Sequence, residues 1–250
     1  MLGGASSAVI VASGGRELFL RFRAAPEALD DRADPLDRFT RAAVEAAVGE
    51  VLGDASAERP DGVPGDAAGA RGPTRPRYRL FFPFVVPLGP VAGELAGDPD
   101  GHPPALPFQR LGRAAGLGAP GPLGLQIHPH YGPWWAYRAL IVLAGDSARA
   151  SGPRQDASQQ ALSDGCAGCD APCVAACPGD AVRLGGFSIA DCHAHRLVAA
   201  GCRLSCVSRI RCVRGPAERY TDDQLAFHMK ASMPASMPAS IPVTSRIPRP

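Results

Sequence analysis

The eight cysteines of this 250-residue chain all lie between residues 166 and 212, and thiolates are preferred ligands of zinc and of iron–sulfur clusters. The first four occur in the stretch CAGCDAPCVAACPGDAV, and the other four follow at wider intervals. The full set is Cys166, Cys169, Cys173, Cys177, Cys192, Cys202, Cys206 and Cys212. The pattern is compatible with one metal site, with two, or with disulfides.

The first four cysteines have the spacing C-x2-C-x3-C-x3-C-P. Bacterial ferredoxins carry C-x2-C-x2-C-x3-C-P, and in two-cluster versions the fourth cysteine binds the other cluster. The second gap is therefore one residue longer in this chain. Three closely spaced thiolates can surround one face of an iron–sulfur cube, while Cys177, followed by Pro178, is directed toward a second cube.

The remaining cysteines complete two four-iron clusters and leave no thiol over. We expect Cys166, Cys169, Cys173 and Cys212 to hold one cluster, and Cys177, Cys192, Cys202 and Cys206 to hold the other. Three alternatives stay open. A zinc ribbon needs paired C-x2-C knuckles, and only Cys166 with Cys169 forms one. Disulfides need an oxidising compartment. A single cluster with additional inert cysteines fits the irregular later spacings.

Charge and apolar content indicate which classes of partner and which cellular compartment to expect. The formal net charge is only +2, so a nucleic-acid partner is not expected on bulk charge. No apolar run is long enough for a membrane helix, and the N-terminus lacks the basic residues of a signal peptide. We therefore expect a cytoplasmic protein, in which cysteines bind metal. Arginines near the later cysteines fit a solvated surface, compensation of an anionic centre, or an acidic partner; they are Arg203, Arg209, Arg211, Arg214 and Arg219.

The N-terminal part predicts a mixed α/β domain over residues 1–146. A short buried strand is expected at Ala8–Ala12, and Asp34 with Pro35 can begin a helix. The apolar face of that helix would contain Leu36, Phe39, Ala43, Ala47 and Val51. Further strands are expected at 78–86, interrupted by Pro83, at 123–127 and at 137–144, with a helix at 108–115. Residues 53–77 are rich in Gly, Pro and Ala and predict a flexible loop.

The C-terminal part predicts a second, smaller domain. Residues 147–164 are polar and small and form the expected linker to a ferredoxin-type domain at 165–230. A helix is expected at Asp222–Ala231, and the repeat of Ala-Ser-Met/Ile-Pro predicts a disordered tail at 231–250. The expected fold class is α+β: an N-terminal mixed α/β domain followed by a small, loop-rich, helical dicluster ferredoxin-like domain.

The segment Ala115–Leu143, AGLGAPGPLGLQIHPHYGPWWAYRALIVL, resembles a segment of the epoxyqueuosine reductase family. In that family an AGLG-x-x-G motif leads through a strand to a Pro-x-x-Gly turn, and a dicluster ferredoxin module follows. The stretch GFSIADCHAH at 186–195 resembles the part where a lone cysteine precedes the second ligand group, which implies a ligand role for Cys192. Unlike the family, this chain has Val213 rather than proline after its last cysteine.

Short bacterial ferredoxin-like proteins are similar over more of the chain. The similarity rests on DPLDR at 34–38, PFQR at 107–110, IHPHYG at 127–132 and QLAFHM at 224–229. These resemblances imply an iron–sulfur electron-transfer protein with two [4Fe-4S] clusters and a redox partner protein. The alternative that they imply is an oxidoreductase with a corrinoid or small-molecule site in the N-terminal domain. A redox-silent structural metal module is a third hypothesis.

Several histidines and aromatic residues are secondary candidates. His128, His130 and Tyr131 lie beside Trp134 and Trp135, where they could line a pocket or anchor the small domain; we favour the anchor. His193 and His195 flank Cys192 and could tune a cluster through hydrogen bonds to sulfur. His228 is expected to be a packed residue. The sequence contains no phosphate-binding loop or catalytic triad, and no residue is assigned as catalytic.

Overall fold

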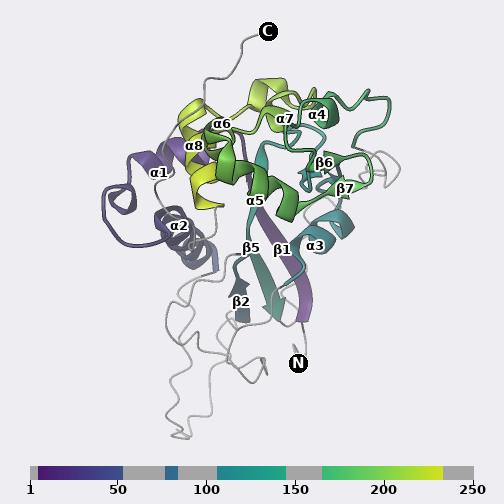
Figure 1. Cartoon of the computed structure of the whole chain (residues 1–250). Coiled ribbons are helices and arrows are strands. Elements are labelled where there is room, and N and C mark those ends of the chain that lie inside the picture. The colour runs from purple at the N-terminus through teal and green to yellow at the C-terminus, as the bar shows by residue number, and fades with distance from the viewer. Residues whose placement is uncertain (1–4, 53–76, 84–105, 145–164, 233–250) are drawn as a thin grey trace, which may run out of the picture. The chain divides into compact units, whose positions relative to one another are not determined.

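The computed structural model describes residues 5–52, 77–83, 106–144 and 165–232 (Figure 1). The chain divides into two compact units: residues 1–13, 20–111 and 136–156 form the first, and residues 14–19, 112–135 and 157–250 form the second. Each unit has its own core. No helix in the described ranges is long and apolar enough to cross a membrane.

The first unit is built around a three-stranded sheet with the order β1-β5-β2. Its strands are β1 (Ala5–Gly14), β2 (Arg77–Phe81) and β5 (Trp135–Ala144). β2 runs antiparallel to β5, with Tyr78 opposite Leu143 and Leu80 opposite Ile141. The predicted strands at 8–12 and 137–144 are confirmed, and the strand expected from Tyr78 is confirmed to Phe81; residues 84–86 lie outside the described residues.

The central strand β5 is covered on both faces, which fits the apolar run from Ala139 to Ala144 that follows the buried Arg138. Ala139 is fully buried and packs with Val44 and Val48 of helix α2 (Pro35–Leu52). The residues next to it along the strand point the other way, because side chains alternate across a strand. Leu140 and Val142 therefore pack against Phe108 of helix α3 (Phe108–Ala114), and this helix confirms the one predicted there.

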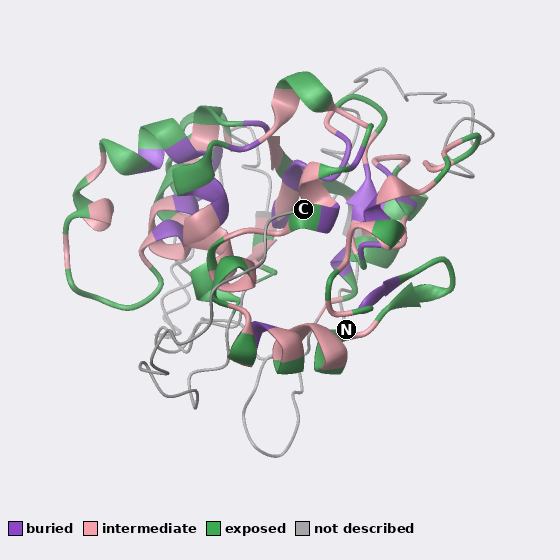
Figure 2. Ribbon diagram, turned by 45° about the horizontal axis from the view of Figure 1, so that its top comes forward, coloured by how far each residue is buried: buried purple, intermediate pink, exposed green. Residues whose placement is uncertain are grey.

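Helix α2 begins at Pro35 and buries Leu36 as predicted, but the rest of its predicted buried face, from Ala43 to Val51, is wrong. The side chains that it buries are Leu36, Thr40, Val44 and Val48, drawn in purple in Figure 2. Ala43 and Ala47 are exposed, and Val51 is 80% exposed. Packing against β5 turns the branched valines inward, because they bury more apolar area than the alanines.

Strand β1 is also less buried than the sequence predicts, since Val9 is 47% exposed while Ile10 and Val11 are half-buried. Helix α1 (Glu17–Arg23) and the 3-10 turn Pro26–Ala28 were not predicted. The predicted loop at 53–77 lies outside the described residues apart from Arg77. The linker at 147–164 is outside them as well, and so is the tail at 231–250 beyond Ser232.

The second unit combines short helices with two small antiparallel hairpins, so the fold is α+β as expected. The hairpins are β3 (Ala119–Pro120) with β4 (Gln126–Ile127), and β6 (Val182–Arg183) with β7 (Gly186–Phe187). The helices are α4 (Pro172–Ala175), α5 (Ile189–Val198), α6 (Ala200–Leu204), α7 (Val207–Ile210) and α8 (Asp222–Ala231), with a 3-10 turn at Pro216–Glu218. The predicted strand at 123–127 is shorter than expected, and the predicted helix at 222–231 is confirmed.

Residues 112–135 belong to the same unit as the cysteines. Leu123 is buried against Cys173, Cys212 and Val182. Gly132 and Gly215 bring two loops into backbone contact, and both have positive φ angles, 57° and 58°. A Cβ on Gly132 would lie 2.3 Å from the carbonyl oxygen of Arg214, so only glycine fits this crossing.

Candidate metal centre

The first cysteine group is held by one turn and one short helix. Cys166 and Cys169 lie in the same turn, where the Cys169 N–H donates to the Cys166 carbonyl at 3.0 Å. The longer gap that follows includes Ala171, whose left-handed φ of 50° turns the chain into α4. Pro172 starts α4, Cys173 is buried within it, and Cys177 follows its end. The extra residue relative to the ferredoxin spacing is thus accommodated in this loop.

The later cysteines come from three successive helices. Cys192 lies in α5, which Ser188 caps by accepting the Asp191 N–H at 3.2 Å. Cys202 lies in α6, and Cys206 is the N-cap residue of α7. Cys212 is buried just after α7. All eight cysteines are free, so the structure contains no disulfide among them.

The charges of neighbouring thiols affect the pKa values of several cysteines and indicate two groups among them, although Cys177 also packs against the hydrophobic cluster that contains Cys173 and Cys212. Burial raises the pKa of Cys173, and the charges of Cys212 and Cys169 raise it further. Burial likewise raises the pKa of Cys212, with a further contribution from Cys169. Cys169, Cys173 and Cys212 are therefore near neighbours, and Cys166 joins Cys169 through their shared turn. We call these four residues the first set.

The second set is Cys177, Cys192, Cys202 and Cys206. Burial raises the pKa of Cys192, and the charges of Cys206 and Cys177 act in the same direction. The pKa of Cys202 is raised by burial and then by Cys206, Cys177 and Cys192. Burial also raises the pKa of Cys206, to which the charge of Cys177 contributes. These four residues are the ones expected from the sequence to hold one cluster, and the assignment of ligands to clusters stays a prediction.

Cys177 lies in a different environment, because hydrogen bonds stabilise its thiolate. Burial alone would raise its pKa, but the net pKa is lowered. The donors are the backbone N–H groups of Val182, Gly179 and Ala181 and the hydroxyl of Ser208. Ser208 is only 2% exposed, so this hydroxyl is a buried donor. A sulfur with several donors is favoured as an anion, which is the form that binds metal.

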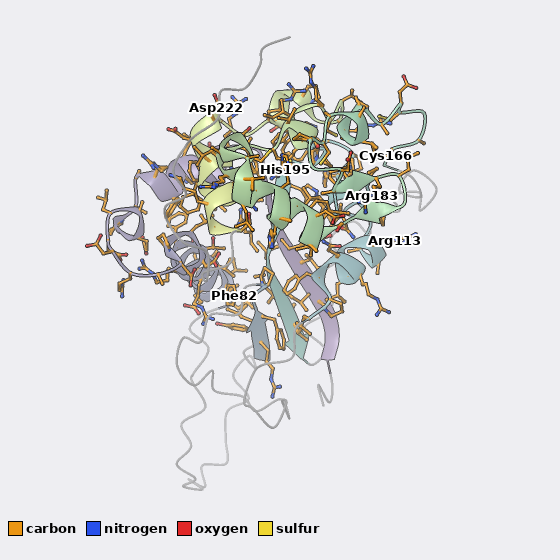
Figure 3. All side chains as sticks on the ribbon, in the orientation of Figure 1. Phe82, Arg113, Cys166, Arg183, His195 and Asp222 are labelled. Carbon is orange, nitrogen blue, oxygen red and sulfur yellow. The ribbon has the colours of Figure 1, made fainter. Side chains whose placement is uncertain are left out.

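The four cysteines of the second set surround one cavity. Its empty space is about 380 Å³, part of it open to solvent, and the lining includes Cys177, Cys192, Cys202 and Cys206. Other lining residues are His195, Arg196, Ser208 and Met229. His195, labelled in Figure 3, packs so closely on Gly179 that a Cβ there would lie 2.6 Å from the histidine Cβ. Within the described residues, no three Cys, His, Asp or Glu side chains form a site for a single metal ion.

In the described part of the chain, the arginines near the later cysteines form no ion pair with a carboxylate. Between residues 196 and 219 the sequence contains six arginines and one acidic residue, Glu218. Several of these arginines donate to backbone carbonyl groups: Arg214 donates to that of Ala167 at 2.9 Å and Arg219 to that of Cys212 at 3.3 Å. The buried Nε atoms of four of them have no hydrogen-bond partner in the described part of the chain; they belong to Arg196, Arg209, Arg214 and Arg219. This region thus carries positive charge and spare donors.

Arg209 is fixed by aromatic contacts. Its guanidinium lies 4.8 Å from the ring centroid of Trp134 and 4.6 Å from that of Tyr220, and it donates to the Pro133 carbonyl at 2.5 Å. The charge and the backbone N–H of Arg209 both lower the pKa of Cys206 against the effect of burial. The aromatic residues therefore position a cation beside the second set.

The His128–Trp135 turn is held by internal contacts. The Nδ1 atom of His128 accepts the N–H groups of His130 and Tyr131 at 3.1 and 3.2 Å, and its ring lies 5.3 Å from that of Trp135. Burial, with a smaller contribution from His130, lowers the pKa of His128. Trp135 donates from Nε1 to the Gln126 carbonyl at 2.9 Å. These contacts are those of an anchoring turn.

Sequence reasoning missed two residues of the second set's surroundings, Arg196 and Ser208. Arg196 could have been found, because it follows Cys192 by four residues on a helix and so shares its face. No sequence pattern pointed to Ser208, because its contact with Cys177 is a tertiary contact. Comparisons with protein-family models, with curated proteins and with solved structures find no match to this chain.

Proposed function

We propose that the chain is an iron–sulfur electron-transfer protein that holds two [4Fe-4S] clusters. The first set would hold one cluster and the second set the other. Thiolates are the usual protein ligands of such clusters, and four are needed for each. The observation that supports the proposal most strongly is the cavity lined by all four cysteines of the second set. In a cube each thiolate binds its own iron atom, so ligands arranged around a space suit it.

The surroundings of the cysteines also fit an anionic group. A cluster with four thiolates is negative, and it becomes more negative when it accepts an electron. The arginines between 196 and 219 would offset this charge, and the Ser208 hydroxyl would hold the Cys177 sulfur. When bound, the clusters would supply one-electron transfer. The protein's groups would set the potential, which cation charge and hydrogen bonds to sulfur raise.

The proposal includes a redox partner protein and a cytoplasmic location, where reduced thiols are available to bind iron. Arg211 is next to Cys212 in the sequence and is the exposed one among the six arginines at 196–219, so it is a candidate contact for an acidic partner. We expect Arg211→Glu to lower the rate at which an acidic electron donor reduces the clusters. The decrease should be largest at low ionic strength, where charges are least screened.

The test is anaerobic purification followed by metal analysis and EPR spectroscopy before and after reduction by dithionite. The proposal predicts iron as the bound metal and a paramagnetic signal that appears on one-electron reduction. Zinc with no reducible signal would refute the electron-transfer function and support a structural metal module instead.

A further inference from the structure

Arg196 is a buried cation in contact with two parts of the second unit. Its side chain is only 3% exposed, and it lines the cavity of the second set. It follows Cys192 by four residues on α5, so the two side chains lie on the same face of this helix. Arg196 makes no ion pair with a carboxylate among the described residues.

The two Nη atoms of the Arg196 guanidinium contact the last turn of α8. Nη2 donates to the Met229 carbonyl, and Nη1 donates to the Ser232 hydroxyl at 3.2 Å. The same hydroxyl donates to the Met229 carbonyl at 3.0 Å, and Met229 itself lines the cavity. The position of Arg196 is fixed in turn, because its carbonyl accepts Nε of Arg203 at 2.9 Å.

The start of α8 is anchored independently of Arg196. Thr221 caps the helix by accepting the Gln224 N–H at 3.2 Å, and Gln224 donates from its side chain to the Gly15 carbonyl at 3.2 Å. Leu225 packs with Trp134 and Tyr220. Asp222, at the start of the helix, is labelled in Figure 3. A change at Arg196 should therefore affect the end of α8 more than its start.

We propose that Arg196 couples the second cluster to α8, so that loading of this cluster closes the last helical turn and its loss releases it. The proposal rests on the proposed function, because the cluster is the anion that Arg196 would face. A buried guanidinium without an anion is unfavourable, and water must then reach it. With the cluster bound, its negative charge compensates that of the Arg196 guanidinium. The guanidinium can then keep its hydrogen bonds to Met229 and Ser232 without water entering the site.

The test is amide hydrogen exchange of the full chain, measured by mass spectrometry after iron and sulfide have been counted in each sample. Arg196→Gln should raise exchange in the last turn of α8 by about tenfold or more, whereas peptides from its first turn should change little. Ser232→Ala should raise the same exchange less, without loss of iron. Arg183→Gln is the matched control, because Arg183 is exposed and pairs with Asp191 at 2.7 Å.

Removal of the clusters by a chelator should open the last turn in the wild type, and should add little in Arg196→Gln. Arg196→Gln should also lower the reduction potential of one cluster only. Unchanged exchange at the end of α8 in both Arg196→Gln and Ser232→Ala, with clusters present, would overturn the coupling and leave the proposed function standing. A wild-type chain without iron–sulfur clusters would overturn both.

Discussion

Among the cysteines with shifted pKa values, Cys177 is the one whose pKa is lowered, and a single buried hydroxyl distinguishes its surroundings. The Ser208 hydroxyl donates to its sulfur alongside three backbone N–H groups. Backbone donors come with the fold, but the hydroxyl is a property of the side chain. Residue 208 therefore offers a direct way to change the electronic environment of the second set.

We predict that Ser208→Ala lowers the reduction potential of one cluster. The shift reflects how much stronger the hydrogen bond is in the reduced state, so a bond worth about 0.5–1.5 kcal/mol sets an upper limit of about 20–60 mV for one electron. The measurement is a potentiometric titration followed by EPR. Ser205→Ala is the control, because Ser205 also lines the cavity but is not among the donors to Cys177. An upward shift, or equal shifts in both variants, would contradict the role of Ser208.

The assignment of the cysteines to two sets predicts which cysteine substitutions remove the same EPR signal. Cys177→Ala and Cys202→Ala should remove the same EPR signal, and Cys173→Ala should remove the other, because under the proposed function each set would hold its own cluster. EPR of the reduced proteins, with iron counted in each, provides the measurement. If Cys177→Ala instead resembles Cys173→Ala and differs from Cys202→Ala, the assignment of Cys177 to the second set is wrong.

Among the elements, the crossing of two loops at Gly132 and Gly215 links the segment before the cysteines to the end of the cysteine region. A side chain at Gly132 would collide with the backbone of Arg214, two residues after Cys212. The crossing therefore supports the first set, although neither glycine contributes a ligand. The positive φ angle at Gly132 adds strain for any other residue.

We predict that Gly132→Ala destabilises the second unit by about 2–4 kcal/mol and reduces its iron content. Thermal unfolding and iron analysis of the full chain measure the two effects. Gly185→Ala is the control, since a Cβ at Gly185 meets nothing within 4 Å and its φ angle is not positive. Equal stability of the two variants would show that the crossing is not rigid.

Helix α2 carries a carboxyl group whose ionisation opposes folding. Burial raises the pKa of Asp37 to about 6, the charge of Asp34 raises it further, and Arg138 opposes both. Because the folded-state pKa exceeds the usual value of 3.8, folding favours the protonated form. The contribution of Asp37 to stability is thus greatest below about pH 4 and is lost as the pH rises through about 6.

We predict that Asp37→Asn stabilises the chain at pH 7 by about 1 kcal/mol, after allowance for the partial exposure of this residue. The gain should shrink as the pH is lowered toward 5. Urea denaturation between pH 5 and 7.5 measures it, with the exposed Asp31→Asn as the control. A gain that does not depend on pH would contradict this account of Asp37.

Patterns in short stretches of sequence predicted most of the longer helices and strands correctly. Helices α8 and α3 were predicted from the sequence, the start of α2 followed from its capping residues, and the strand β5 was predicted as well. Most of the predicted buried face of α2 was wrong, because alanine and valine positions compete and only the sheet decides between them. Burial of β1 was also overestimated from its apolar residues alone.

The cysteine sets could be proposed from spacing and number, because ligand loops are short and local. Their surroundings could not, since Arg196 and Ser208 act through tertiary contacts. The packing of Leu123 on Cys173 and Cys212 was equally hidden, as about fifty and ninety residues separate the partners in the sequence. Long-range contacts of this kind leave no periodic signal.

At the scale of the whole molecule, the second unit is made of three segments that are separate in the sequence. Residues 14–19 and 112–135 belong with the cysteine region, whereas the sheet belongs to the other unit. A fragment that starts at residue 157 would lack Leu123, Gly132 and Trp134. We predict that such a fragment retains less iron per chain than the full protein after the same anaerobic reconstitution, and iron analysis of the two, side by side, is the measurement. Equal iron content would contradict a supporting role for residues 112–135.

The proposed function requires that the eight cysteines hold two four-iron clusters. Iron and acid-labile sulfide, counted per chain in the anaerobically purified full protein, measure the number of clusters. We expect about eight of each. About four of each would contradict the two-cluster proposal and indicate one cluster with inert cysteines, and zinc without sulfide would contradict it entirely.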